Sequence, residues 1–395
     1  MSRKSRLPKG GVNLFQEIKK KTDESVAMGQ DIFRLSIGQP IGPALDIARE
    51  AAAVAVKSAE ESIHEYQDNG SPGVPAFAQE FCQFHNVTNL SVDDGLAFLP
   101  IPGIKPMLPL IPLACGAVKS KSLKIGVMTE PGYPVPKTWD KYLPYEAIPI
   151  PLTPEKEFRF HVNDLNDEVS GVMLNYPHNP TGQTVSESWW HDVCKYCEAN
   201  DIRIFNDAAY AKLAFGDHCT LADVAIAYPR LSWAEAYSAS KMGCNFTGWR
   251  IGAIVGSEDF IGDIATIKGN IDSGFFAPAA AGVLAAVKNA PDAVNVYCDM
   301  FQERQNWLCH TLKSRGMQLA VEPQATFFNL WLTPERAFGQ TITSAQQFNY
   351  LMIEKTGIVG VHFEPYIRYA VVADILQPDF QNAIINAFDQ AQVEY

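Results

Sequence analysis

Several polar residues whose side chains can do chemistry stand at the ends of successive apolar segments in the middle of the chain. They are Asn179 in NYPHNPTG, Asp207 and Tyr210 in FNDAAY, Ser238, Ser240 and Lys241 in YSASK, and Arg250 in TGWRIG. Together they offer an amine, a carboxylate, a phenol, hydroxyls and a guanidinium, the groups that proteins use for nucleophilic, acid–base and anion-binding chemistry. Each motif alone is common, but their order along the chain indicates one shared site.

The segments around these residues alternate between short apolar runs and helical patterns. Apolar runs occupy 171–175, 202–206, 234–238 and 251–255, and an amphipathic helix is expected at 186–200. This alternation is typical of βα units that build a mostly parallel central sheet with helices on both faces. In such sheets the ligand binds beyond the carboxyl ends of the strands. We therefore predict an α/β fold with its site where the polar residues follow the strands.

Composition and charge narrow the class of protein. The chain has 395 residues, of which 47% are hydrophobic, and a formal net charge of −12. It is long enough for two domains and too apolar for a disordered chain. The acidic balance argues against nucleic acid as the main partner, because phosphate backbones are bound through surplus Lys and Arg. No internal repeat or low-complexity tract is present.

The pattern changes near residue 279. A long helical stretch is expected from about 279 to 314, followed by a strand-like segment at 326–332 and a final strand–helix pair. We predict a large domain at 44–278 and a smaller α+β domain built from two separate segments, 1–43 and 279–395.

Neither a membrane nor a metal ion is expected. The stretch Leu99–Val118 approaches membrane-spanning length but carries five prolines and a lysine, and a buried helix or loop suits it better. The basic N-terminus is not followed by an apolar run, so no signal peptide is expected. Eight scattered cysteines favour a reducing cytoplasm. Cys194 and Cys197 form an isolated CxxC inside an amphipathic pattern, which favours helix packing over metal binding.

The motifs between Asn175 and Gly252 resemble those of class I aminotransferases, a family of fold-type I enzymes that use pyridoxal 5′-phosphate (PLP). The resemblance extends from LSIGQP at 35–40 to YIRYAV at 366–371. It is nearest to the group of aspartate, alanine and LL-diaminopimelate aminotransferases. The implied fold is a mostly parallel central sheet with helices on both faces and a smaller α+β domain.

The resemblance also implies roles around the cofactor ring. Lys241 is similar to the family's Schiff-base lysine, whose freed amine moves the proton between the substrate α-carbon and the cofactor. Asp207 resembles the carboxylate that pairs with the pyridine nitrogen and keeps it protonated, so that the ring accepts electrons. Asn179 and Tyr210 resemble the two donors to the phenolate oxygen that tune the imine pKa. Tyr133 in EPGYP resembles the aromatic residue that stacks on the ring.

For the cofactor phosphate, the resemblance implies side-chain ligands and backbone amides at a helix N-terminus, which is a favourable anion site. The side-chain ligands are Ser238, Ser240 and Arg250, and the amides are those of Gly103, Ile104 and Lys105. This loop departs from the family pattern because Pro106, Pro109 and Pro112 follow closely. The first two prolines fit the first turn of a helix, whereas Pro112 is expected to kink it.

The substrate and a second subunit complete the implied site. Arg368 in YIRYAV corresponds to the arginine that binds the substrate α-carboxylate, because its planar fork matches a carboxylate. Gly38 lies where backbone closes over the same carboxylate, and Asn179 also contributes. Tyr66 in HEYQDNGSPG resembles a tyrosine that reaches the phosphate of the neighbouring subunit, which implies a homodimer with shared active sites.

The resemblance therefore implies an aminotransferase that moves an amino group from an L-amino acid to a 2-oxo acid in two half-reactions. A PLP-dependent carbon–sulfur β-lyase on the same fold stays open as the alternative, because residues that hold the cofactor do not choose which bond breaks. A non-catalytic PLP-binding regulator usually has a DNA-binding module, and no basic helical module precedes this fold. A nicotinamide dehydrogenase is disfavoured because no GxGxxG follows a strand.

Overall fold

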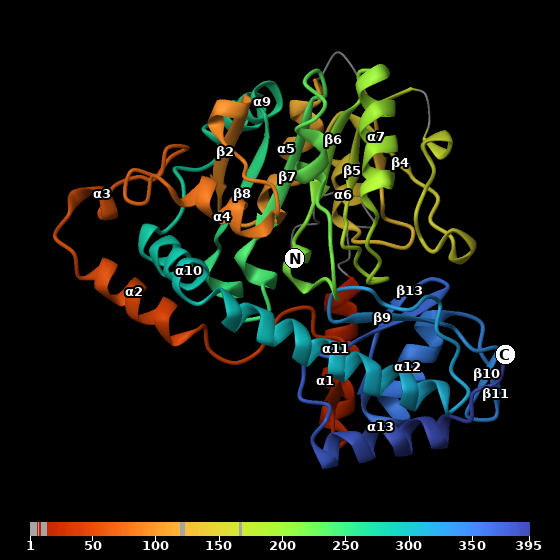
Figure 1. The fold of residues 1–395 in the computed structure, drawn as a ribbon. Coiled ribbons are helices and arrows are strands. Elements are labelled where there is room, and N and C mark those ends of the chain that lie inside the picture. Colours follow the sequence, from red (N-terminus) through yellow and green to blue (C-terminus); the bar gives the residue numbers. More distant parts are fainter. Residues whose placement is uncertain (1–5, 7, 9–13, 119–122, 166–167) are drawn as a thin grey trace.

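The computed structural model describes all residues except 1–5, 7, 9–13, 119–122 and 166–167. Its central feature is a seven-stranded sheet in the order β2-β8-β7-β6-β5-β3-β4 (Figure 1). The strands are β2 (Leu96–Ile101), β3 (Leu123–Val127), β4 (Tyr145–Pro149), β5 (Val169–Leu174), β6 (Arg203–Asp207), β7 (Trp233–Ser238) and β8 (Gly252–Ser257). Strand β8 is antiparallel to both of its neighbours, and the other pairs are parallel. The predicted α/β fold with a mostly parallel sheet is confirmed.

Helices pack on both faces of this sheet, as predicted. One apolar cluster contains residues of α4 (Phe77–His85), α7 (Glu187–Ala199), α8 (Leu221–Ala225) and α10 (Ala277–Asn289), together with Val255 of β8. A second cluster contains residues of α5 (Leu110–Ala114) and α9 (Glu258–Lys268), together with Ile254 of the same strand. Adjacent residues of a strand point to opposite faces, so the two clusters lie on opposite sides of the sheet.

Three further helices belong to this part of the chain. They are α2 (Asp46–Val56), α3 (Glu61–His64) and α6 (Val135–Thr138). Helix α2 runs beside α10, and α2 and α3 project from the body of the sheet (Figure 1).

A second group of elements lies at the other end of the molecule (Figure 1). It has the antiparallel sheet β13-β14-β9, the parallel pair β1-β12 and the hairpin β10-β11. The elements are α1 (Leu14–Ala27), β1 (Phe33–Arg34), α11 (Pro291–Lys313), β9 (Phe328–Leu332), β10 (Arg336–Ala337), β11 (Gln340–Thr341), α12 (Ala345–Thr356), β12 (Ile358–Val359), β13 (Val361–Phe363), β14 (Tyr366–Ala370) and α13 (Pro378–Ala391). The N-terminal strand β1 therefore pairs with the C-terminal part of the chain. The exact domain boundaries stay a prediction.

Two local expectations need correction. The helical stretch expected from 279 to 314 is two helices, because α10 ends at Asn289 and α11 begins at Pro291. A proline at the first helical position lacks the N–H that would continue the preceding helix, so it starts a new one. The expected kink at Pro112 is also wrong. Residues 105–107 form a 3₁₀ turn, and α5 starts only at Leu110, so Pro112 lies in a first turn, where its missing N–H costs little.

None of the helices in the described part of the chain combines the length and the apolar character needed to cross a bilayer. The stretch Leu99–Val118 contains the end of β2, the 3₁₀ turn and the short helix α5. All eight cysteines belong to the described residues and are free thiols. Cys194 and Cys197 are buried in α7 and join the apolar cluster on that face of the sheet, as predicted.

Candidate active site

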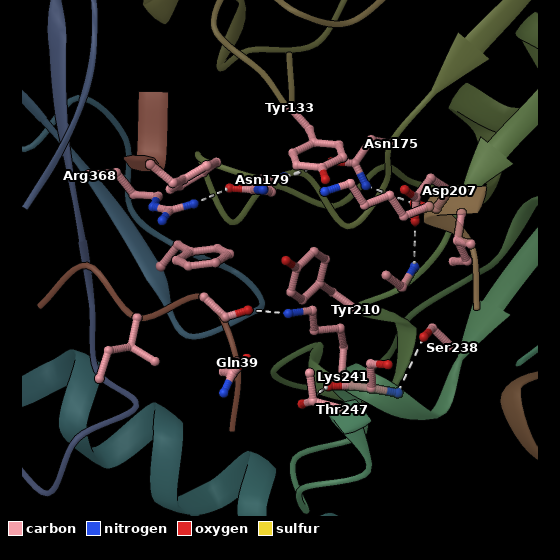
Figure 2. Close-up of a pocket in the computed structure, with 18 of the residues that line it drawn as sticks. Gln39, Tyr133, Asn175, Asn179, Asp207, Tyr210, Ser238, Lys241, Thr247 and Arg368 are labelled. Atoms are coloured by element: carbon pink, nitrogen blue, oxygen red, sulfur yellow. Dashed lines mark hydrogen bonds between the residues drawn. The ribbon is translucent and has the colours of Figure 1, made fainter. Parts of the chain in front are cut away.

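A cavity of about 540 Å³ lies at the carboxyl ends of β5, β6 and β7, on the side that faces β14. Every predicted site residue except Gly103 and Tyr66 lines it: Gly38, Ile104, Lys105, Tyr133, Asn179, Asp207, Tyr210, Ser238, Ser240, Lys241, Arg250 and Arg368. In Figure 2, Lys241 and Asp207 reach the cavity from neighbouring strand ends, and Arg368 reaches it from the opposite side. The strand-end rule therefore located the cavity correctly.

Lys241 follows β7 in a 3₁₀ turn and points into the cavity, where its Nζ donates a hydrogen bond to the carbonyl oxygen of Gly38 (Figure 2). Burial and the nearby charge of Arg368 lower the pKa of Lys241 to about 8, while the Asp207 carboxylate acts in the opposite direction. A lysine with this pKa has a substantial neutral fraction near pH 7 to 8, and the neutral amine is the nucleophile.

Asp207 is the last residue of β6, and its side chain lies at the cavity wall. Burial raises the pKa of its carboxyl to about 6, while the Ala209 amide and the charge of Lys241 oppose that shift. The Ala209 N–H donates to Oδ1 over 3.1 Å. The Asp207 backbone is held as well, because Asn175 Nδ2 donates a hydrogen bond to its carbonyl oxygen over 2.7 Å. The carboxylate therefore keeps acceptor capacity toward the cavity.

One end of the cavity combines hydroxyl groups with a guanidinium. Ser238 ends β7, and its Oγ accepts a hydrogen bond from the Ser240 N–H over 3.2 Å. Arg250 Nη1 donates to Ser240 Oγ over 3.3 Å and to the Thr247 carbonyl over 3.0 Å. Gly103 does not line the cavity but lies directly against this arginine: a Cβ built on it would come within 2.6 Å of Arg250 Nη2. Its φ of +85° also favours glycine.

Arg368 lies on β14 and is almost fully buried at the opposite end. Its Nη1 donates to Asn179 Oδ1 over 2.8 Å, its Nη2 donates to the Ser36 carbonyl over 3.3 Å, and its guanidinium lies 4.0 Å from the Phe328 ring centroid. Burial lowers the pKa of Arg368 to about 10, so it stays cationic at neutral pH. No partner for its Nε is found among the described residues. A buried cation with an unused donor is suited to an anionic ligand.

Two tyrosine side chains lie between these ends (Figure 2). Burial raises the pKa of Tyr133 to about 12, and it also raises the pKa of Tyr210. Both phenols are therefore protonated at neutral pH and are able to donate a hydrogen bond. Tyr210 packs edge-on against the rings of Phe327 and Phe328, which fixes its orientation.

Tyr66 stands apart from this arrangement. It follows α3, its side chain is 77% exposed, and it does not line the cavity. Within one chain the structure therefore does not bring Tyr66 to the other predicted residues.

Sequence reasoning missed other lining residues, namely Phe15, Ser36, Ile37, Gln39, Asn175, Ala209, Thr247 and Phe328. Asn175 had a usable signal, because it is the first polar residue after β5 and the strand-end rule applies to it. Phe15 had none, because it lies outside every motif and only tertiary structure brings it to the cavity. Ser36 had one, because it belongs to the motif LSIGQP, two residues before the predicted Gly38.

The geometry defines a class: an α/β enzyme with a lysine amine, a carboxylate, an anion-binding end and a second buried arginine around one cavity. The family model described as aminotransferase class I and II matches residues 30–380, and the chain belongs to this family. The resemblance predicted from the motifs is confirmed. Members of the family depend on PLP, so PLP is the cofactor, and the chain is an aminotransferase that moves an amino group from an amino acid to a 2-oxo acid.

Related aminotransferases match this sequence along almost the whole chain. An LL-diaminopimelate aminotransferase of Gloeobacter violaceus is 27% identical over 399 residues, covering 94% of each chain. An LL-diaminopimelate aminotransferase of Syntrophobacter fumaroxidans is 28% identical over 375 residues, covering 91% of this chain and 92% of that protein. An aspartate aminotransferase structure from Rhizobium meliloti has a TM-score of 0.85 at 17% identity and covers 99% of each chain. This structural likeness confirms the predicted fold-type I architecture.

Proposed function

We propose that this cavity is the active site of the aminotransferase and that its residues hold the roles expected from the motifs. The observation that carries the proposal is that Lys241 and Asp207 face the same cavity closely enough for each to shift the pKa of the other. An amine nucleophile and a carboxylate are the two groups that PLP chemistry needs at opposite sides of the cofactor ring.

The residues fit PLP at its phosphate end. Ser238, Ser240 and Arg250 supply hydroxyls and a fixed positive charge, and the guanidinium is already oriented by the Thr247 carbonyl. Position 103 has no room for a side chain, because the Arg250 guanidinium lies directly against Gly103. A dianionic phosphate is bound well by such a set of donors. We propose that these residues, with the backbone of Ile104 and Lys105, hold the phosphate.

The residues fit the ring end as well. When bound, PLP supplies the electron sink that stabilises negative charge at the substrate α-carbon. Lys241 would hold the cofactor through its aldehyde carbon, and Asp207 would hold the protonated ring nitrogen. Asn179 and Tyr210 would donate to the phenolate oxygen, and Tyr133 would stack on the ring. The lowered pKa of Lys241 lets its amine accept and return the α-proton near neutral pH.

The opposite end of the cavity suits the substrate α-carboxylate. Arg368 is buried, charged and held by Asn179, and its Nε is free of partners among the described residues. Gly38 lies near this guanidinium, because a Cβ at Gly38 would be 4.0 Å from Arg368 Nη2. We propose that Arg368 binds the carboxylate and that Asn179 and the Gly38 backbone complete the pocket.

The same geometry supports the proposed domain division. Lys241 and Asp207 come from the proposed large domain, 44–278, whereas Gly38 and Arg368 come from the two segments of the proposed small domain, 1–43 and 279–395. The cofactor groups and the carboxylate-binding groups would therefore belong to different domains that meet at the cavity.

We further propose a homodimer in the cytoplasm. The exposed side chain of Tyr66 does not reach the cavity of its own chain, which agrees with a role at the phosphate of a second subunit. The eight free thiols agree with a reducing compartment. A sedimentation measurement combined with a Tyr66→Phe variant tests the dimer and the shared site together.

The decisive experiment for the activity is a panel of amino donors and 2-oxo acids tested with the PLP-loaded enzyme. LL-diaminopimelate belongs in the panel because relatives carry that name. Formation of a new amino acid that depends on the added 2-oxo acid supports the proposal. Release of ammonia and pyruvate from a donor, without dependence on a 2-oxo acid, would instead identify the carbon–sulfur β-lyase.

A further inference from the structure

The central sheet contains a fully buried carboxylate that faces away from the cavity. Glu235 lies in β7 beside Asn206 of β6, and both side chains are 0% exposed. Glu235 Oε1 accepts a hydrogen bond from Asn206 Nδ2 over 2.7 Å. Its Oε2 accepts from the Ala222 N–H over 2.7 Å and from the Tyr237 hydroxyl over 2.8 Å. A buried carboxylate is tolerated only when donors surround it in this way.

Asn206 uses its remaining hydrogen-bonding groups to hold one backbone unit beyond the end of β5. Its Oδ1 accepts from the Tyr176 N–H over 2.9 Å, and its Nδ2 donates to the Tyr176 carbonyl over 3.0 Å. Glu235 accepts from the same amide nitrogen and thereby sets which way the Asn206 carboxamide faces. The Asn206 side chain therefore holds the backbone two residues beyond the end of β5 without any β-ladder bond.

Tyr176 is part of a short loop, 175–179, whose last residue, Asn179, contacts Arg368. Asn175, directly before Tyr176, accepts a hydrogen bond at Oδ1 from the Asn179 N–H over 3.0 Å. The Asn179 side chain then accepts from Arg368 Nη1 over 2.8 Å. The hydrogen bonds thus run from Glu235 through Asn206 and the Tyr176 backbone to the residue that contacts the buried arginine.

We propose that Asn206, oriented by Glu235, is a positioning residue of the active site: it fixes the 175–179 loop so that Asn179 meets both Arg368 and the cofactor oxygen. This inference rests on the proposed role of Asn179. Asn206 touches neither cofactor nor substrate in the proposal and acts only through the loop. A displacement of about 1 Å at Asn179 is enough to weaken carboxylate binding, because catalytic geometry tolerates little error.

The test is the Asn206→Ala variant of the PLP-loaded enzyme. We expect the KM for the amino donor to rise about tenfold, with a smaller change in kcat. We also expect a higher midpoint for the pH titration of the bound cofactor's absorbance, because a donor to the phenolate oxygen stabilises the form that lacks the proton. A purely structural residue would move neither quantity in the protein that folds.

Two control variants separate the possible failures. Tyr237→Phe removes one donor from Glu235 in the same buried cluster but no contact to the loop, so it is expected to lower stability while KM and the titration midpoint stay unchanged. Asn179→Ala removes the proposed contact residue itself. If Asn179→Ala shifts both readouts and Asn206→Ala shifts neither, the positioning role is wrong while the site assignment stands. If Asn179→Ala shifts neither, the site assignment itself is wrong.

A second variant keeps the inference testable if Asn206→Ala does not fold. Glu235→Gln preserves the shape of the side chain but turns an amide hydrogen toward one of the surrounding donors, which loosens the hold on Asn206. We expect a rise in KM of about threefold with the same upward shift of the titration midpoint. A variant with unchanged KM and unchanged midpoint would overturn the role of Glu235 in orienting Asn206.

Discussion

Asp207 and Glu235 lie on neighbouring strands of the central sheet, one residue apart in register, and point to opposite faces. Asn206 pairs with Glu235 and Asp207 pairs with Ala236, so the two acids project from opposite sides of the sheet. Burial raises the pKa of both carboxyls, to about 6 for Asp207 and about 7 for Glu235. The environment therefore penalises the charge of both acids in the same way.

The acids differ in how their oxygens are used. Glu235 accepts four hydrogen bonds, from Asn206, Tyr237 and the backbone amides of residues 221 and 222. Its side chain is fully buried in the core. Asp207 accepts from the Ala209 amide and otherwise faces the cavity. A saturated carboxylate has a structural role, whereas one with unused acceptors beside a cavity is suited to a cationic ligand group. Lys241 and Arg368 resemble Asp207 in this respect, because their side-chain donors also face the cavity.

The largest effect is expected for a change on the cavity side, Lys241→Ala. Loss of both the covalent link and the proton-transferring amine should lower kcat by more than about 1000-fold, while PLP still binds noncovalently. Stopped-flow absorbance of the half-reaction measures this. Lys212→Ala is a matched control, because burial also lowers the pKa of Lys212, yet it lies outside the cavity. Full activity in Lys241→Ala would refute the role of the amine.

The two acids themselves give the next largest contrast. Asp207→Asn cannot hold a protonated ring nitrogen, so we expect kcat to fall by about 100-fold, which corresponds to about 2.7 kcal/mol of transition-state stabilisation. Glu235→Gln should lower kcat by less than about fivefold, because its effect passes only through the loop. Steady-state kinetics of both variants decides the comparison. Equal losses of kcat would show that the saturated acid is as important to the chemistry as the open one.

Arg368→Ala tests the opposite end of the cavity. Charge-assisted hydrogen bonds to a carboxylate are worth roughly 1.5–3 kcal/mol, so the KM for amino donors should rise by about ten- to 100-fold. Arg368→Lys keeps the charge but loses the planar fork and should recover only part of the affinity. A KM that does not change in Arg368→Ala would remove this residue from substrate binding.

The smallest effect concerns the stability of the protein without PLP. Because the pKa of Asp207 is raised from 3.8 to about 6, its folded form holds a proton more tightly than the unfolded chain. Stability is therefore lost as pH rises from about 4 to about 6. Asp207→Asn removes this penalty and should raise the free energy of unfolding by roughly 1–3 kcal/mol at pH 7, with little gain at pH 4. Urea unfolding at both pH values measures it, and a less stable variant at pH 7 would contradict the raised pKa.

Much of the fold and of the cavity follows from local patterns. The apolar runs that become β5 to β8 are bounded by polar residues, and the strand-end rule then brings Asp207, Ser238 and Lys241 to one place. This works because strand formation depends on nearby residues and because parallel strands end at the same edge of a sheet.

Other features depend on contacts that no local pattern encodes. Phe15 lies in α1, which packs against α12, and Ser36 follows β1, which pairs with β12, so both depend on contacts with residues near the other end of the chain. The break between α10 and α11 depends on a single proline, Pro291. Glu235 resembles any polar residue of a half-exposed strand until β6 and the amides of residues 221 and 222 close around it. Strand register and pairing between segments that are distant in the sequence determine these features.

The role of Lys241 is tested most directly by locating the cofactor in the chain. Holoprotein is treated with borohydride, which makes the cofactor link permanent, and is then digested and mapped by mass spectrometry. We predict a single pyridoxyl group on Lys241, and none on Lys105 or Lys212. A pyridoxyl group on another lysine, or none at all in protein that binds PLP, would show that Lys241 is not the residue that holds the cofactor.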